Sequence, residues 1–217
     1  MSQYFLLSDT ETGGLEPGTG DKAGDLLTAY FAILDEDYKI IEELDLKLKP
    51  NDNRLPIAGV EALRVNGINI KEHVENPETI SYAEGKVRLV SLIKKYLKKT
   101  GRFSNIRFMG YNTPFDTKFE QYYLLPAEEW NTLIHYKQVD VMQYVDFLKI
   151  CGWWPSSLGS LNSVVEYLNL AKRQFHTAKD DCLATLDVLK KILAMMKEKK
   201  EGSTGTSQDL ISLLEAE

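Results

Sequence analysis

Two carboxylates stand two residues apart near the N-terminus, in the segment Asp9-Thr10-Glu11. They follow a short apolar run at residues 4–8, which predicts a buried strand. Residues i and i+2 of a strand point to the same side, so both carboxylates would project from one face of a sheet. Two like charges at that spacing favour a proton or a bridging cation, and oxygen ligands suit Mg²⁺ or Mn²⁺. Taken alone, the segment is a weak signal, and acidic residues that cap a turn are the favoured interpretation.

Two later segments carry further groups of the same chemistry. Asp116 follows a predicted strand at residues 106–110 and falls in the first turn of a helix that begins at Thr113. His176 precedes Asp181 by five residues, which is ~140° around a helix, so the two converge only if His176 precedes the first turn. Singly, Asp116 could complement a helix dipole and His176 could be an idle surface residue. Together, the three segments lie at strand ends and helix starts, where α/β sheets form their sites.

The elements that position these groups begin with three strands. Apolar or alternating runs at residues 4–8, 26–34 and 40–48 are separated by a glycine-rich loop and a polar turn, which predicts an antiparallel meander. Ser81 and Glu84 form a capping box that opens a helix ending before Gly101. A short strand is expected at residues 139–141, and helices at residues 56–65, 113–125, 141–149, 160–169 and 177–198. This order predicts an α/β fold with a mixed sheet of about five strands.

The three acidic segments, in this order and spacing, resemble the three exonuclease motifs of the DEDDh 3′→5′ exonucleases. That family includes the proofreading epsilon subunit of bacterial replicase, oligoribonuclease and ribonuclease T. The resemblance covers about residues 4–196. It implies an RNase H-like fold, a mixed five-stranded sheet with the first three strands antiparallel and flanked by helices. The exonuclease domain would span residues 1–200, followed by a flexible C-terminal tail at residues 201–217.

The resemblance also implies roles for single residues. Four acids would bind two Mg²⁺ or Mn²⁺ ions and act with His176, the general base, as the catalytic set: Asp9, Glu11, Asp116 and Asp181. Substrate contacts would come from Thr10, Thr12, Leu15, Asn112 and Phe115, the first three of them to the 3′-terminal nucleotide. Asp140 is similar to an acid that the family carries after the second motif, whereas Asn66 stands where a histidine is common. The family's Thr-Thr-Gly-Leu is Thr12-Gly13-Gly14-Leu15 here, and we expect the extra glycine to loosen the loop.

The activity implied is metal-dependent 3′→5′ hydrolysis of phosphodiester bonds in single-stranded nucleic acid, with DNA favoured over RNA. Nucleoside 5′-monophosphates would be released by a two-metal mechanism with a histidine base. An RNA-trimming or oligoribonuclease-like exonuclease is the alternative within this class. From another class, the alternative is a catalytically silent nucleic-acid-binding or scaffolding domain of the same fold.

Residues outside the motifs suggest where partners bind. Lys172 and Arg173 are the favoured phosphate contacts, while the basic cluster Lys94, Lys95, Lys98, Lys99, Arg102 and Arg107 is more typical of a solvated helix end. Trp153 and Trp154 could stack on bases or pack in the core. Gln208, Ile211 and the following leucines faintly resemble sliding-clamp-binding peptides. A polymerase or sliding clamp is therefore a candidate partner of the tail, and a frayed amphipathic end is the alternative.

The composition limits the remaining classes. Among 217 residues, 26 lysines and arginines stand against 32 acids, so the net charge is −6. That balance argues against a tight, metal-independent binder of internal duplex sites. The two cysteines make no disulfide framework and favour a reducing compartment. The sequence has neither a signal peptide nor the ~18 apolar residues of a membrane helix, so we expect a cytoplasmic protein without membrane contact.

Overall fold

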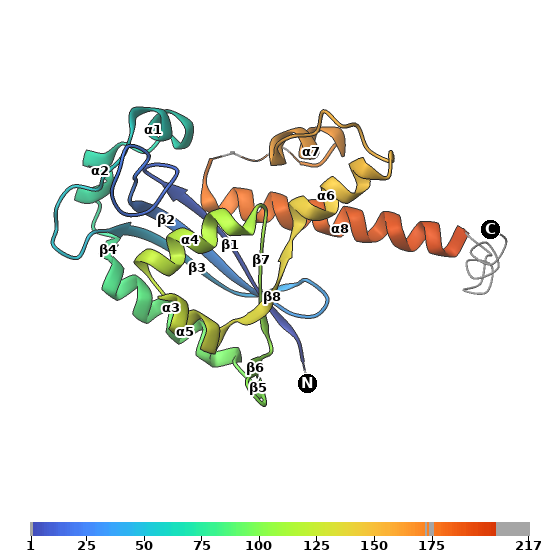
Figure 1. The fold of residues 1–217 in the computed structure, drawn as a ribbon, viewed down its shortest axis with the longest axis horizontal. Coiled ribbons are helices and arrows are strands. Elements are labelled where there is room, and N and C mark those ends of the chain that lie inside the picture. The colour runs from blue at the N-terminus through green and yellow to red at the C-terminus, as the bar shows by residue number, and fades with distance from the viewer. Residues whose placement is uncertain (1, 172, 174–175, 203–217) are drawn as a thin grey trace.

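The computed structural model describes residues 2–171, 173 and 176–202 of the chain. A mixed sheet lies at the centre, with helices on both of its faces (Figure 1). Its strand order is β4-β3-β2-β1-β7-β8. The strands are β1 Tyr4–Thr12, β2 Leu26–Leu34, β3 Ile40–Lys49, β4 Thr79–Ser81, β7 Ile106–Gly110 and β8 His135–Asp140. A separate hairpin joins β5 Lys99–Thr100 to β6 Phe103–Ser104.

The antiparallel meander predicted for the first three strands is confirmed. Strand β1 is longer than the apolar run predicts, because it stays paired with β2 through the acidic segment as far as Thr12. Strands β7 and β8 run parallel to β1. The carboxyl ends of these three strands therefore lie at one end of the sheet, and their amino ends lie at the other.

Eight helices are present in the described residues. They are α1 Val60–Asn66, α2 Ile70–Glu75, α3 Tyr82–Tyr96, α4 Thr113–Tyr123, α5 Ala127–Leu133, α6 Val141–Ile150, α7 Leu161–Tyr167 and α8 Ala178–Gly202. One apolar core lies between the sheet and α6, α7 and α8, and a second lies between the sheet and α3, α4 and α5. Odd residues of β1, such as Leu7, belong to the first core, and even ones, such as Leu6, belong to the second. By this alternation Asp9 and Glu11 face the α8 side, and Thr10 faces the α4 side.

Local signals account for several element boundaries. The Ser81 hydroxyl accepts a hydrogen bond from the Glu84 backbone N–H and so caps α3, whereas the Glu84 carboxylate pairs with Arg88 instead of completing the predicted capping box. Gly67 ends α1 in the left-handed conformation, with φ at 68°. The sheet has six strands rather than about five, because Thr79–Ser81 pairs in parallel with β3. Helix α8 continues to Gly202, four residues beyond its predicted end, and residues 203–217 of the proposed tail lie outside the described residues.

The predicted state of the cysteines is confirmed. Both are free thiols, with Cys151 exposed and Cys182 buried. Among the helices of the described residues, none has the length and apolar character needed to cross a bilayer.

Candidate active site

Three of the four predicted metal ligands form one cluster. Carboxylate oxygens of Asp9, Glu11 and Asp181 lie within 4.8 Å of one another. The first two side chains project from the end of β1, and Asp181 comes from the first turn of α8, which packs against that face. One oxygen of Asp181, Oδ1, is buried and has no hydrogen-bond partner in the described part of the chain. A buried oxygen without a donor fits a site that takes a cation or a proton.

The fourth acid, Asp116, reaches the same end of the sheet from the opposite face. It lies in the first turn of α4 and is only 1% exposed. Its Oδ1 accepts a hydrogen bond of 2.8 Å from the hydroxyl of Thr10. Its charge nevertheless raises the pKa of Asp9 and of Glu11, so the four acids share one electrostatic field. Asp116 lies outside the tight group of three carboxylates.

The electrostatics of this site disfavour four ionised carboxylates. Burial, followed by the charges of Asp181 and Asp116, raises the pKa of Glu11 to about 8. Burial raises the pKa of Asp116 to about 7, although the Thr10 hydrogen bond opposes that shift. The pKa of Asp9 also rises, through burial and then through the neighbouring acids. Protons or divalent cations relieve such repulsion, and an all-oxygen donor set suits Mg²⁺ or Mn²⁺, so these residues fit the implied metals.

The proposed base, His176, lies at the rim of the cluster. It is exposed and adopts the left-handed conformation, with φ at 70°, two residues before α8 begins. Its backbone N–H donates to Asp181 Oδ2 at 3.3 Å. The predicted condition that it precede the first turn is therefore met. In the described residues its ring is not part of the carboxylate group.

A fifth acid, Glu120, was not predicted. It is fully buried, and its Oε1 accepts a hydrogen bond of 2.5 Å from the Ser8 hydroxyl, while its Oε2 is buried without a partner among the described residues. Burial and the charge of Asp116 raise its pKa well above that of an ordinary glutamate. The sequence did contain one indication that Glu120 belongs to the site. Asp116 and Glu120 stand four residues apart on one helix face, where like charges are unfavourable.

Asp140 has a structural position at the end of β8. Its carboxylate accepts hydrogen bonds from the backbone N–H groups of Asn112, Thr113 and Met142. It thereby holds the N-terminus of α4, which carries Asp116, and caps α6. Asn112 is exposed, with φ at 64°, and is not among the residues that line the adjacent pocket.

A pocket of about 470 Å³ adjoins the carboxylates. It brings together four of the five residues predicted to contact substrate, Thr10, Thr12, Leu15 and Phe115. Its walls also include Glu11, Gly13, Gly14, Asp21, Lys22, Ala23, Gly59, Glu61, Ala62, Val65 and Asn66. Leu15 is 58% exposed, so it offers an apolar surface to a bound molecule.

The glycine loop is tightly packed, so the expectation that an extra glycine loosens it is wrong. A Cβ on Gly13 would lie 2.1 Å from the Ile57 carbonyl oxygen, and one on Gly14 would lie 2.6 Å from the Lys22 oxygen. Backbone hydrogen bonds also tie the loop to residues 57–59. Asn66, in the place of the family's histidine, donates from its side chain to the Thr12 carbonyl. These glycines allow close backbone contact, not freedom of movement.

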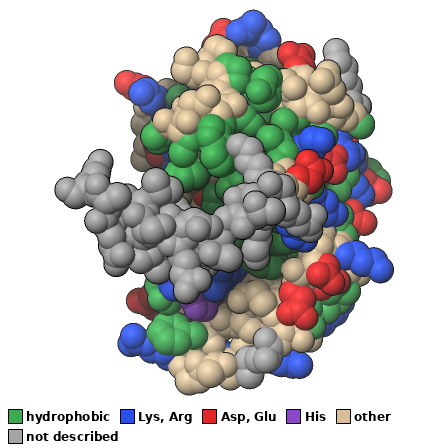
Figure 2. All heavy atoms as spheres, turned by 90° about the vertical axis from the view of Figure 1, so that its right-hand side faces the viewer, with side chains coloured by type: hydrophobic (Ala, Val, Ile, Leu, Met, Phe, Trp, Pro, Cys, Tyr) green, Lys and Arg blue, Asp and Glu red, His purple; other side chains and the backbone are tan. Residues whose placement is uncertain are grey.

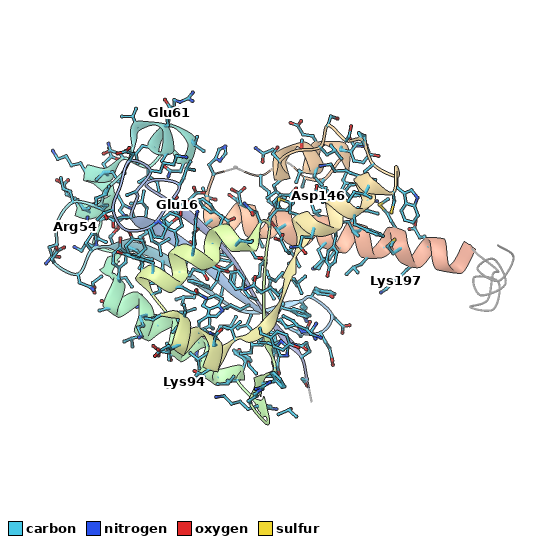
Figure 3. The ribbon with its side chains drawn as sticks, viewed as in Figure 1. Glu16, Arg54, Glu61, Lys94, Asp146 and Lys197 are labelled. Carbon is cyan, nitrogen blue, oxygen red and sulfur yellow. The ribbon has the colours of Figure 1, made fainter. Side chains whose placement is uncertain are left out.

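Lys118 joins the loop to α4, a connection that sequence reasoning missed. Its Nζ donates to the Leu15 carbonyl at 2.5 Å and to Glu16 Oε1 at 2.9 Å. It also lies 4.9 Å above the ring centroid of Phe115. Figure 3 labels Glu16 beside α4, at the end of the molecule where Glu61 marks α1. One lysine thus fixes the distance between the two apolar pocket residues Leu15 and Phe115.

The other predicted contacts are less favourably placed for nucleic acid. Arg173 pairs with Asp187 at 2.5 Å, and Lys172 lies outside the described residues. Trp154 is buried in an edge-to-face contact with Tyr167. Trp153 is partly exposed, next to α6 and α8. Core packing therefore accounts for Trp154.

Comparison with known proteins gives a consistent answer at the level of the fold. No protein-family model and no curated protein sequence matches the chain. Solved structures of Escherichia coli exonuclease I do match it. The zinc-bound complex with single-stranded DNA is 21% identical, with a TM-score of 0.68 over 88% of this chain and 40% of that one.

Two further structures of the same enzyme agree. The complex with a dT13 oligonucleotide is 20% identical, with a TM-score of 0.64 over 88% of this chain and 41% of that one. The complex with SSB-Ct is 19% identical, with a TM-score of 0.63 and the same coverage. The chain thus spans about two fifths of the length of these proteins. It has the RNase H-like fold of the exonuclease I structures, as the resemblance to DEDDh exonucleases predicts.

Proposed function

We propose that the chain is a metal-dependent 3′→5′ exonuclease acting on single-stranded nucleic acid, with DNA the favoured substrate. The observation that carries this proposal is the carboxylate group of Asp9, Glu11 and Asp181 beside a pocket of nucleotide-compatible size. Six of the matching exonuclease I structures were solved with single-stranded DNA or a deoxyoligonucleotide, which supports the choice of DNA.

The residues that would hold two Mg²⁺ or Mn²⁺ ions are Asp9, Glu11, Asp116 and Asp181. When bound, the ions supply Lewis-acid activation of water and stabilise charge on the departing 3′ oxygen. The four carboxylates lose their mutual repulsion at the same time, since their charges are then matched by cations. The site becomes attractive to a phosphodiester only in that state.

His176 is the proposed general base. Its exposed position just before α8 leaves the ring able to turn toward the carboxylates, while its backbone remains bonded to Asp181. An imidazole accepts protons near neutral pH, as removal of a proton from the attacking water requires. Reaction at the terminal phosphodiester releases a nucleoside 5′-monophosphate and leaves a new 3′ hydroxyl.

The pocket would hold the 3′-terminal nucleotide. Leu15 and Phe115 offer apolar surface to the base, and Thr10 and Thr12 lie next to the carboxylates. The packed glycines hold this wall of the pocket close to the neighbouring protein backbone, so the wall is fixed in place. Asn112 lies outside this pocket and remains a proposed substrate contact.

A single assay tests the proposal. A 20-nucleotide DNA labelled at its 5′ end is incubated with Mg²⁺, and the products are separated by length. We expect a descending ladder, release of 5′-monophosphates, and no reaction in EDTA or on a strand whose 3′ end is blocked. The rate of the same reaction is then measured on short RNA, and the comparison decides whether DNA or RNA is the preferred substrate. An unchanged strand under all conditions would favour the silent binding domain instead.

The proposed contact of residues 203–217 with a polymerase or sliding clamp needs a separate test. Pull-down of the clamp by the full chain, but not by a chain ending at Gly202, is the expected result. Equal capture by both chains would show that residues 203–217 are not needed for clamp binding.

A further inference from the structure

Three aromatic rings gather at the end of the sheet opposite the carboxylates. Phe103 comes from β6, and His135 and Tyr136 begin β8. The ring centroid of Phe103 lies 5.6 Å from the centroid of His135 and 5.6 Å from that of Tyr136. The His135 ring stacks on Tyr136, with 4.6 Å between centroids. The hairpin that carries Phe103 lies at the lower end of the molecule in Figure 1, away from α1 and the pocket.

Two cations lie over these rings. The guanidinium carbon of Arg102 is 5.0 Å from the Phe103 centroid, and Lys137 Nζ is 5.8 Å from that of Tyr136. Much of the aromatic surface still faces solvent, since Phe103 is 40% and Tyr136 66% exposed. We call these five residues, Arg102, Phe103, His135, Tyr136 and Lys137, the basic-aromatic platform.

The charge around the platform is positive. Within the part of the chain that the structure describes, Arg102 and Lys137 form no ion pair with an acid. The charged groups that act on His135 are Arg107 and Lys137, both cationic. Lys99 adds an exposed cation on the same hairpin, and Lys94 marks the adjacent end of α3 in Figure 3. Figure 2 likewise shows basic and hydrophobic side chains together at the lower end of the face drawn.

We infer that the basic-aromatic platform binds single-stranded nucleic acid at a second site, separate from the carboxylates. Exposed rings bind bases through stacking, and neighbouring cations bind the phosphates between them. Arginine beside a ring adds a planar group that stacks in the same way. The pairing of rings with unmatched cations distinguishes this surface from a simple solvated helix end, which needs no exposed aromatic groups.

The platform and the carboxylates lie at opposite ends of β8. His135 and Asp140 are separated by five residues of strand, or ~17 Å at the usual rise. A single strand could therefore contact both only over several nucleotides. The platform uses cations of the chain itself, so it binds without added metal and the inference does not rest on the proposed hydrolysis.

Binding of fluorescein-labelled dT20 is measured by anisotropy in EDTA, with the full chain and low salt. The test variant is Phe103→Leu with Tyr136→Leu, which keeps apolar bulk and removes both rings. We expect roughly tenfold or greater weakening, the range for loss of base stacking. Lys137→Glu should weaken binding and reduce its salt dependence. Lys197→Glu, on the far part of α8 in Figure 3, is the matched charge control and should bind as wild type does.

Several outcomes would overturn the inference. Equal affinity of wild type and the double leucine variant would exclude the rings, and absence of wild-type binding in EDTA would exclude the site. Tighter platform-dependent binding of an acidic peptide than of dT20 would assign the surface to a protein partner. Thermal melts of each variant identify loss of fold. If the leucine variant unfolds, Tyr136→Phe and Tyr136→Ala replace it, and only the alanine is expected to weaken binding.

Discussion

The two ends of strand β8 differ in charge and in burial, two properties that affect phosphate binding. At the carboxyl end, Asp140 holds helix α4, and four buried or half-buried acids lie near one another. At the amino end, exposed rings and unmatched cations form the basic-aromatic platform. A net charge of −6 describes neither end. It follows that the overall charge of a chain says little about binding when opposite charges are sorted to opposite ends of one sheet.

The two ends also differ in their energetic cost. Burial of like charges raises the pKa of Glu11 to about 8, so the ionised acid end destabilises the metal-free protein. The platform lies at the surface, where solvent screens its charges. We therefore expect divalent cations to stabilise the acid end of the protein and to have no effect on the platform.

The largest expected effect comes from Asp9→Asn. Loss of one carboxylate from the proposed metal site should reduce hydrolysis of dT20 by about 10³-fold, because several kcal/mol of transition-state stabilisation would be lost. Binding of dT20 in EDTA should be unchanged, since the platform is intact. Asp146→Asn, on α6 and labelled in Figure 3, is the matched control and should retain the wild-type rate. Similar rates for the Asp9 variant and wild type would refute the site.

The next effect is that of His176→Ala. Removal of the proposed base should lower kcat by roughly 10²-fold, because the attacking water would lose its proton acceptor. Divalent-cation binding should persist, because the imidazole is not part of the carboxylate group. A variant that loses metal binding together with activity would show instead that His176 is a ligand.

A smaller effect is expected from Lys118→Met, which keeps the stem of the side chain and removes its charge. Loss of its bonds to Leu15 and Glu16 should raise KM roughly five- to tenfold with little change in kcat, which matches the net ~1 kcal/mol of a hydrogen bond that is partly exposed to solvent. Lys118→Arg should restore KM. The control is Lys86→Met, a lysine of similar exposure that pairs with Glu129 away from the pocket. An altered kcat with normal KM would contradict the positioning role.

The smallest effect concerns stability. Because the pKa of Glu11 and that of Asp116 are raised in the folded state, the folded protein binds more protons than the unfolded chain between about pH 4 and 8. Metal-free stability should therefore fall as pH rises through this window. Thermal melts in EDTA should show a lower Tm at pH 8 than at pH 5, and Mg²⁺ should raise Tm more at pH 8. A Tm that rises with pH in Glu11→Gln and wild type alike would contradict this assignment.

Much of the fold follows from short-range sequence signals. The meander was predictable because buried apolar runs alternate with polar turns, and Ser81 marked the start of α3. The acids at the carboxyl end were predictable since strand spacing places Asp9 and Glu11 on one face. The short helix α5 and strand β4 were not, because they owe their stability to packing on neighbouring elements.

The features that were missed depend on tertiary contacts. Glu120 is an ordinary helical glutamate until α4 packs over Ser8. The platform unites Phe103 with His135 and Tyr136, more than 30 residues later, and no periodicity connects them. The glycine loop is tightly packed because residues 57–59 lie against it. The sequence does not reveal that contact, so it could not show whether the extra glycine makes the loop flexible or lets it pack closely.

The central claim is that the acid end holds divalent cations, and calorimetric titration of Mn²⁺ tests it most directly. The full chain is saturated with a nucleoside 5′-monophosphate, and wild type is compared with Asp9→Asn. The account predicts two bound ions per wild-type chain and loss of at least one in the variant. No Mn²⁺ binding by wild type, or equal binding by both proteins, would contradict it.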